Sequence, residues 1–186
     1  MSKSLLYLGS IEVGDALMIY KFGNKKPTVS ESAFIAETAC IIGDVSIGER
    51  TSIWFNTVIR GDRAKISIGS GCNIQDNAVV HTDENEIKIG DNVIIGHGCV
   101  VHGKRIDNNA LIGINATILH GVHVGEYAIV GAGAVVPPNY KVPANTVVMG
   151  VPCKEVRKTN EEDIEMIRNT LRNYEQLTAE YLKMKG

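Results

Sequence analysis

The sequence predicts a mainly β fold, a parallel β-helix of hexapeptide repeats, followed by one C-terminal α-helix. Two observations predict it. Aliphatic residues recur at every sixth position over most of the chain, and glycine often follows them or lies nearby. Beyond residue 157 this period stops and apolar residues recur at helical spacing. A helix needs apolar spacing near three and four, and an ordinary strand needs strict alternation, so neither explains a period of six.

The repeat runs from residue 41 to residue 136. Each hexapeptide supplies a short strand and a turn with its aliphatic side chain pointing inward, and three hexapeptides complete one coil of a triangular prism. Stacked coils lie at the ordinary strand spacing of about 4.8 Å. The inward residues are Ile41, Ile47, Ile53, Ile59, Ile68, Ile74, Val80, Ile89, Ile95, Val101, Ile106, Ile112, Ile118, Val124, Val130 and Val136.

The six-residue phase breaks three times. Three extra residues lie within 59–68 and three more within 80–89, whereas one residue is missing within 101–106. We expect both insertions to form loops that point outward.

The helical pattern divides the chain into a β-helix domain with an N-terminal lead-in, residues 1–157, and a C-terminal helix, residues 158–186. Thr159 or Asn160 can cap the helix, and acidic residues in its first turn suit the positive end of the helix dipole. We expect its apolar face to pack along the prism; a free helix that binds a partner is the alternative. This face comprises Ile164, Ile167, Leu171, Tyr174 and Tyr181.

Composition and charge exclude several classes of partner. Lys and Arg number 19 against 21 Asp and Glu, so the chain lacks the basic excess that neutralises phosphates. The N-terminal segment has no unbroken apolar core of a signal peptide, and no apolar run approaches a membrane span. The four cysteines form no CxxC pair. We expect a cytoplasmic protein that binds neither nucleic acid nor membranes.

Two of the five histidines occupy equivalent places in the repeat. His81 and His102 each follow the inward aliphatic residue of the same face, and their separation of 21 residues is one coil of 18 plus the three-residue insertion. We therefore predict that they stack about one strand spacing apart. That is close enough to share a metal ion whose bonds to nitrogen are about 2.0–2.1 Å long. Arg60 continues this column one coil earlier.

His97 belongs to the preceding face, two positions past the inward residue Ile95. A rigid convex prism cannot turn its side chain around the corner to the stacked pair, but a neighbouring molecule can present it there. If three prisms pack about a threefold axis, each interface gathers His81 and His102 from one chain and His97 from the next. Closed cyclic symmetry then gives three equivalent sites.

Further polar residues fall at the same predicted interface. Asp76 lies one coil before His97, 21 residues earlier, with Gln75 beside it. Arg60 and Asp62 can form a charge pair there. Buried polar groups of this kind need partners.

Three neutral imidazoles with one open position are typical of a catalytic zinc site, because a closed structural site has four protein ligands. The metal lowers the pKa of its bound water, and the resulting hydroxide can attack carbon dioxide. His120 and His123 do not occupy equivalent positions in successive coils, and we expect them to be surface residues.

Three segments carry a close resemblance to one family. "VIRGDRAKISIGSGCNIQDNAVVHT", "IGDNVIIGHGCVVHG" and "MGVPCKEVR" resemble the γ-class carbonic anhydrases, and the similarity extends from about residue 10 to residue 157. It implies a left-handed β-helix and a homotrimer with interfacial metal sites. His81, His97 and His102 would bind zinc or, as in some members, iron or cobalt. The implied reaction is the reversible hydration of carbon dioxide to bicarbonate by a metal-bound hydroxide, a lyase activity.

The same resemblance implies roles for the surrounding residues. Arg60 and Asp62 match the interfacial ion pair of the family, and Gln75 matches the residue that hydrogen-bonds the metal-bound water. Asn73 and Asp76 match the polar surround of the metal.

The sequence departs from the family pattern at the step of proton transfer. A long acidic loop with a proton-shuttling glutamate follows the first histidine in the best-studied active member, whereas only "TDENE" stands here. Glu84 can substitute for that glutamate, although a short loop restricts whether its side chain can point at the metal. Arg63 stands where that member has a second glutamate. We therefore expect low turnover.

Two other functions fit the same repeat. Hexapeptide prisms also occur in acyl- and acetyltransferases, which use one histidine as a general base at a subunit interface. A metal bound by three histidines would occupy the lone pair of that base, so metal content separates the two. The third interpretation is a catalytically silent metal-binding trimer.

Overall fold

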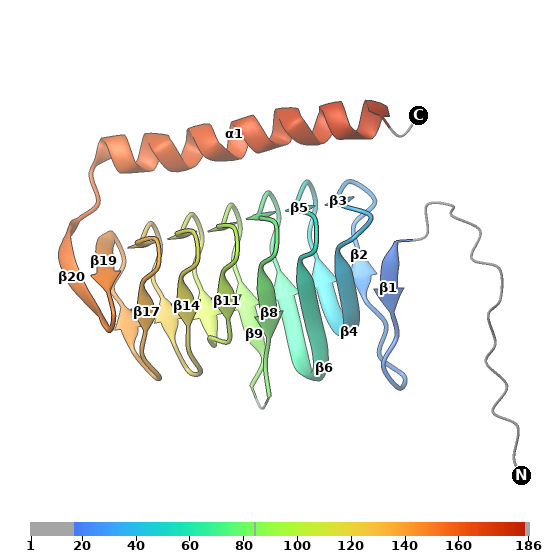
Figure 1. Cartoon of the computed structure of the whole chain (residues 1–186), viewed down its shortest axis with the longest axis horizontal. Helices are drawn as coiled ribbons and strands as arrows, with labels where there is room; N and C mark the ends of the chain where they lie inside the picture. Colours follow the sequence, from blue (N-terminus) through green and yellow to red (C-terminus); the bar gives the residue numbers. More distant parts are fainter. Residues whose placement is uncertain (1–16, 84, 185–186) are drawn as a thin grey trace, which may run out of the picture.

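The computed structural model describes residues 17–83 and 85–184. Figure 1 shows short strands stacked into a prism, with the helix α1 (Glu161–Met184) running along one side. The predicted parallel β-helix with a C-terminal helix is confirmed. No helix in this described part is apolar enough over a sufficient length to span a membrane.

The strands form three faces, which we call the first, second and third face. The first face contains β1 (Met18–Tyr20), β4 (Cys40–Ile47), β6 (Val58–Ile68), β8 (Val79–His81), β11 (Val100–Val101), β14 (Thr117–Ile118) and β17 (Val135–Val136). The second contains the C-terminal ends of β4 and β6, which turn the corner, together with β2 (Thr28–Val29), β9 (Ile87–Ile89), β12 (Arg105–Ile106), β15 (His123–Val124) and β18 (Lys141–Val142). The third contains β3 (Phe34–Ile35), β5 (Ser52–Ile53), β7 (Asn73–Ile74), β10 (Ile94–Ile95), β13 (Leu111–Ile112), β16 (Ile129–Val130), β19 (Thr146–Gly150) and β20 (Cys153–Lys158).

The core is the column of inward aliphatic side chains, and every position predicted to point inward is buried. The coils pair in parallel, as in Val80 opposite Val101. The residue missing within 101–106 shortens one coil, so Arg105 pairs with Lys88, 17 residues earlier. Burial of large aliphatic side chains and the parallel hydrogen-bond ladder together hold the stack.

Asparagine turns many of the prism corners. Asn77 and Asn115, among others, adopt left-handed backbone angles, with φ of 60° and 57°. Asparagine tolerates this conformation better than other non-glycine residues because its short amide can bond locally. The repeat therefore encodes its corners as well as its core.

The two insertions behave differently. Between β8 and β9 the described residues 82–83 and 85–86 leave the prism as the predicted outward loop, whereas the first insertion stays within the single long strand β6. Its extra residues lie opposite a register shift in β4, between Gly43 and Val45. The prediction of a loop there was wrong because strand pairing continues around the corner and absorbs the extra residues as a bulge.

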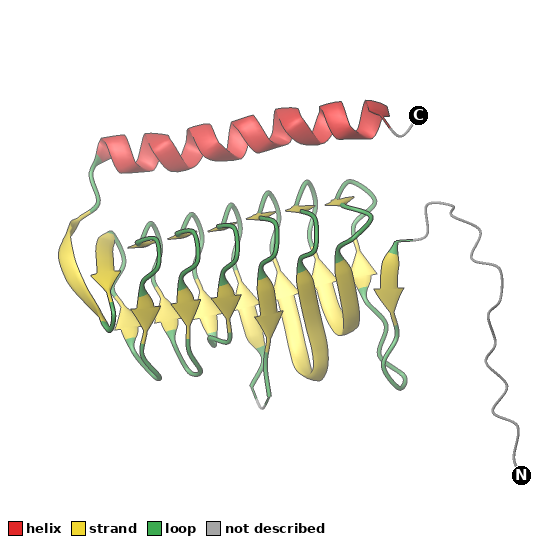
Figure 2. Ribbon diagram, in the orientation of Figure 1, coloured by secondary structure: helices red, strands yellow, loops and turns green. Residues whose placement is uncertain are grey.

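Helix α1 covers the third face (Figure 2). Ile167 is buried in a cluster with the outward-facing Ile94, Ile129 and Val147. Farther along α1, Tyr174 and Tyr181 pack against the Trp54 ring, with centroids 5.1 and 5.4 Å away.

Asn160 caps this helix reciprocally with Asp163. The Asp163 amide donates to Asn160 Oδ1 and the Asn160 amide donates to Asp163 Oδ2, both at 2.9 Å. A hydrogen bond from Arg157 holds the pKa of the Asp163 carboxyl below its usual value. The ion pair between Arg157 and Asp163 thus ties α1 to β20.

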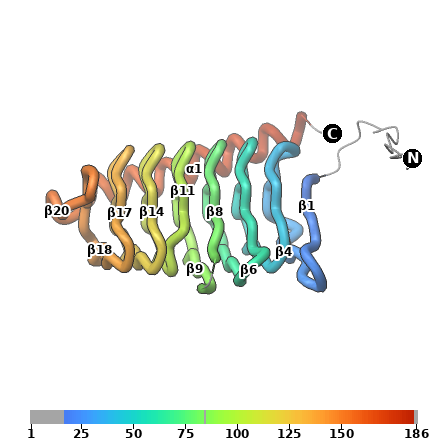
Figure 3. Tube along the Cα trace, turned by 60° about the horizontal axis from the view of Figure 1, so that its bottom comes forward, coloured from blue at the N-terminus to red at the C-terminus, as the bar shows by residue number. Residues whose placement is uncertain are grey.

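The outward positions give each face a different surface. The third face lies under α1, and the second carries polar and charged residues such as Lys88, Arg105 and Lys141. The strands of the first face lie side by side in Figure 3. Their outward side chains form a column that is largely apolar, namely Cys40, Val58, Val79, Val100, Thr117 and Val135.

Candidate functional site

His81 and His102 stand one above the other at the edge of the first face. They follow Val80 and Val101, which pair across β8 and β11. Their ring centroids are 5.5 Å apart, and their side chains are 14% and 27% exposed. Arg60 pairs in register with His81 on the next strand. The predicted column of two histidines above an arginine is therefore present within one chain.

A carboxylate supports His81 from the side of β6. His81 Nε2 donates to Asp62 Oδ1 at 3.1 Å, and Arg60 donates to the other oxygen of the same carboxylate. Burial alone would raise the pKa of Asp62, but the hydrogen bonds from Arg60 and His81 outweigh it and lower that pKa. The ionised carboxylate keeps the His81 proton on Nε2 and leaves Nδ1 with a free lone pair.

The outward loop brings a second carboxylate to the pair. Asp83 Oδ2 lies 3.2 Å from His102 Nε2, and Asp83 Oδ1 lies 3.9 Å from His81 Nδ1. One ligand atom from each of the three residues lies within 4.8 Å of the others. His97 is not a member of this group.

His97 lies at the corner between β10 and β11, flanked by two glycines. A Cβ on Gly96 would lie 2.8 Å from the amide nitrogen of Ile114, and one on Gly98 would collide with the Asn115 side chain. Gly98 also has φ of 69°, which glycine adopts without strain. The two glycines of the "GHG" sequence therefore let this corner pack closely against the coil that follows.

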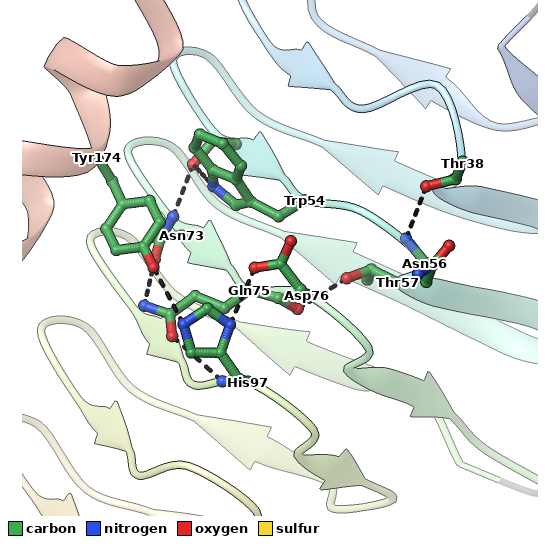
Figure 4. Close-up of polar contacts among 10 residues, drawn as sticks. Thr38, Trp54, Asn56, Thr57, Asn73, Gln75, Asp76, His97 and Tyr174 are labelled. Carbon is green, nitrogen blue, oxygen red and sulfur yellow. Dashed lines mark hydrogen bonds and ion pairs between the residues drawn. The ribbon is translucent and has the colours of Figure 1, made fainter. Parts of the chain in front are cut away.

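The His97 ring lies between Asp76 and Tyr174 (Figure 4). Asp76 Oδ2 is 2.9 Å from His97 Nδ1, and the Tyr174 hydroxyl of α1 is 3.3 Å from Nε2. Burial, together with the Asp76 carboxylate, raises the pKa of the Tyr174 phenol, which stays protonated. With Asp76 holding the proton on Nδ1, the phenol donates to the Nε2 lone pair.

Gln75 and Asn73 form a buried polar chain beside His97 (Figure 4). The His97 backbone amide donates to Gln75 Oε1 at 3.1 Å, and Gln75 Nε2 donates to Asn73 Oδ1 at 2.9 Å. Asn73 Nδ2 in turn donates to Ser52 Oγ at 2.9 Å. Both amides thus fix the backbone that carries His97.

A similar group of arginine, aspartate and histidine occurs on the second face. Asp107 accepts from Arg105 Nε at 2.5 Å and from His123 Nε2 at 2.7 Å. Burial would raise the pKa of Asp107, but these two hydrogen bonds lower it. The strand neighbours of His123 are Arg105 and Lys141, so no second imidazole stacks on it.

The structure brings the predicted site residues together in two groups within one chain. Arg60, Asp62, His81 and His102 form one group, and the other is formed by Asn73, Gln75, Asp76 and His97. Glu84 lies outside the described residues.

Sequence reasoning missed Asp83 and Tyr174. The short acidic segment predicts a role for Glu84 and gives no sign of one for its neighbour Asp83. The helical spacing placed Tyr174 on the packing face but gave no sign that its hydroxyl reaches a histidine.

The donor set fits a divalent metal. In both His81 and His97, one ring nitrogen contacts a carboxylate oxygen, of Asp62 and Asp76 respectively, and the other ring nitrogen points away from that carboxylate. A carboxylate in this position orients a metal-binding imidazole and raises its basicity. The available donors are imidazole nitrogens and carboxylate oxygens, which suit zinc, iron and cobalt.

Comparison with known proteins agrees with the hexapeptide repeat. The family model described as bacterial transferase hexapeptide (six repeats) matches residues 103–138. The chain is 48% identical over 158 residues to a carbonic anhydrase of Geobacillus kaustophilus, covering 84% of this chain and 87% of that protein.

It is also 43% identical over 158 residues to γ carbonic anhydrase 2 of Arabidopsis thaliana mitochondria, covering 81% of this chain but only 57% of that longer protein. Among solved structures, a hexapeptide transferase family protein from Anaplasma phagocytophilum superposes with a TM-score of 0.85 at 38% identity. That match covers 88% of this chain and 98% of the other. This chain belongs to the γ-class carbonic anhydrase family of hexapeptide-repeat proteins.

Proposed function

We propose that the protein catalyses the reversible hydration of carbon dioxide to bicarbonate at a metal centre formed by His81, His102 and His97 of a neighbouring subunit. The stacked pair of His81 and His102 carries the proposal. It places two imidazoles at one point of an otherwise repetitive surface, and Asp62 supports one of them.

The surface of the first face supports a homotrimer. Of the three faces, the third is covered by α1 and the second is charged, which leaves the outward column of the first face as the uncovered apolar one. Val100, beside His102, is 42% exposed in the single chain. Burying this column against another copy removes apolar area from water. It also brings the edge with His81 and His102 to a neighbouring prism.

A divalent metal held by these histidines would act as a Lewis acid and lower the pKa of water, which would supply a nucleophile near neutral pH. Asp62 keeps His81 in one tautomer, and Asp76 does the same for His97. Zinc, iron and cobalt all suit these donors, and we propose zinc as the usual ion.

The remaining residues orient and protect the site. Gln75 uses its carbonyl oxygen and one amide hydrogen within the chain, so its second amide hydrogen can donate to an oxygen atom of the substrate. Arg60 and Asp62 form the ion pair of the subunit interface, and Asn73 and Asp76 complete the polar surround. We assign proton transfer to Glu84 and place the protein in the cytoplasm.

Variants of single histidines test the proposal. Stopped-flow hydration of carbon dioxide and metal content are measured on the same samples of the wild type, His81→Ala, His102→Ala and His123→Ala. The last variant is the matched control, because His123 also pairs with an aspartate beside an arginine but stacks on no histidine. We expect loss of metal-dependent hydration in the first two variants only. Equal activity in all four would refute the site.

An acyltransferase is the second candidate, favoured by the likeness to the hexapeptide transferase family structure. It predicts acetyl group transfer from acetyl-CoA that persists after metal removal, because a general base needs a free imidazole lone pair. A silent metal-binding trimer would bind metal and catalyse neither reaction.

A further inference from the structure

We propose that Asp83 is a metal ligand and that each chain therefore carries its own three-donor set, His81, Asp83 and His102. This set takes up the metal ion before the subunits assemble. The inference deepens the proposed function and rests on it in one respect, that His81 and His102 bind a metal.

The orientation of the His81 ring is the first argument. Asp62 accepts the proton of His81 Nε2, so the lone pair of this imidazole lies on Nδ1. Nδ1 is the nitrogen that faces Asp83, at 3.9 Å from Oδ1. His102 presents Nε2 to the other oxygen of the same carboxylate, at 3.2 Å. Asp83 thus approaches a ring nitrogen of both histidines.

The loop that carries Asp83 is short. On the two sides of Asp83, the Thr82 hydroxyl donates to the backbone oxygen of Asn85 at 2.6 Å. A cavity of about 340 Å³ lies beside it, lined among others by Asp83, His102 and Lys104. The Asp83 side chain is 64% exposed, so a hydrated ion can reach it directly.

The chemistry of this set differs from that of three histidines. Two imidazoles and one carboxylate are a known catalytic zinc set and also the facial set of non-haem iron. The carboxylate adds a negative charge that attracts a cation, which three neutral imidazoles lack.

His97 then completes the site on assembly. Asp83 stands on an exposed loop, so it can withdraw when the neighbouring His97 arrives and leave one position open for water, as a catalytic site requires. In the single chain, His97 Nε2 is meanwhile occupied by the Tyr174 hydroxyl. Asp83 is accordingly a loading ligand.

Metal binding by a set of variants tests this directly. Metal-free wild type, Asp83→Asn, His97→Ala and the double variant are titrated with Co²⁺, whose visible absorption reports ligand number, and affinities come from competition with a chelator. Glu86→Gln is the matched control, because it also removes one negative charge from this loop. Glu86 forms an ion pair with Lys88 of β9.

We expect His97→Ala to keep about one Co²⁺ per chain. The double variant should lose affinity by more than the roughly 100-fold that residues supporting a metal site contribute. Asp83→Asn alone should slow Co²⁺ uptake while barely changing the final affinity of the assembled protein. Glu86→Gln should match the wild type in both measurements. The uptake rate keeps the test decisive if the double variant does not fold.

The inference is overturned if Asp83→Asn takes up Co²⁺ as fast as Glu86→Gln does and the double variant binds Co²⁺ as tightly as His97→Ala does. In that case His97→Ala alone should lose the metal, and the proposed shared site would stand. Absence of metal binding by the wild type would instead refute the proposed function. The two failures are therefore distinguishable.

Discussion

The imidazoles of His81 and His102 lie with their centroids 5.5 Å apart at the ends of the paired strands β8 and β11, although 21 residues separate them in the sequence. One full coil of the prism lies between them. A three-residue insertion in that coil keeps the two histidines in register and at the same time forms the loop that carries Asp83. The repeat and its interruption together build the site.

Asp62→Ala should weaken metal binding without disturbing the prism. The carboxylate fixes the tautomer of His81, and loss of such support costs about 10- to 100-fold in metal affinity. Chelator competition measures this. Asp107→Ala is the control, since Asp107 supports His123 in the same way on another face. An equal loss in both variants would contradict a specific role for Asp62.

Mixed trimers test whether ligands are shared between subunits. Chains bearing His81→Ala are refolded together with chains bearing His97→Ala, each inactive alone. In the proposed homotrimer, every mixed assembly contains one interface where an intact pair of His81 and His102 meets an intact His97. We expect hydration activity to reappear in purified mixed trimers; its absence there would count against the shared site.

Tyr174→Phe should tighten metal binding by a few-fold. The Tyr174 hydroxyl competes for the His97 Nε2 lone pair, and a hydrogen bond of this kind contributes about 1 kcal/mol. The ring remains to pack on Trp54, so α1 should stay docked.

Tyr181→Phe is the comparison for this change, because Tyr181 packs on the same Trp54 ring. Co²⁺ titration of metal-free protein measures both variants. A weaker affinity in Tyr174→Phe than in Tyr181→Phe would show that the hydroxyl helps to hold His97 in place for the metal.

The docking of α1 should weaken at acid pH through Asp163. Its pKa is lowered by Arg157 in the folded protein, so its contribution is present above the unfolded pKa of about 3.9 and is lost as the pH falls through the folded value. Asp163→Ala should cost about 1 kcal/mol at neutral pH, as for a lost helix cap. The difference from wild type should shrink toward zero in acid.

Urea unfolding followed by helical circular dichroism, repeated from neutral pH downward, measures this difference. Glu161→Ala removes an acidic residue of the same first turn and serves as the control. A pH-independent cost for Asp163→Ala would contradict a role for its charge.

The prism and its core could be predicted from the period of six, because the aliphatic side chains at this spacing are all buried together only if each hexapeptide turns one corner of a prism. It also placed His81, His102 and Arg60 in one column, since register follows from counting. Counting residues could not predict the path of β6, because pairing with β4 decides whether the extra residues form a loop or a bulge.

Side-chain contacts between distant segments were equally out of reach. Tyr174 meets His97 across 77 positions, and only the docking of α1 on the third face brings them together. Asp83 is visible in the sequence as an acidic loop residue, but its approach to His102 is a contact that only the structure shows.

The most direct test of the account is a titration of metal into metal-free protein, with carbon dioxide hydration followed by stopped flow at each step. We predict a hydration rate that rises in proportion to bound metal up to one ion per chain, and no such rise in His81→Ala. Full metal occupancy with hydration no faster than the uncatalysed rate would contradict it.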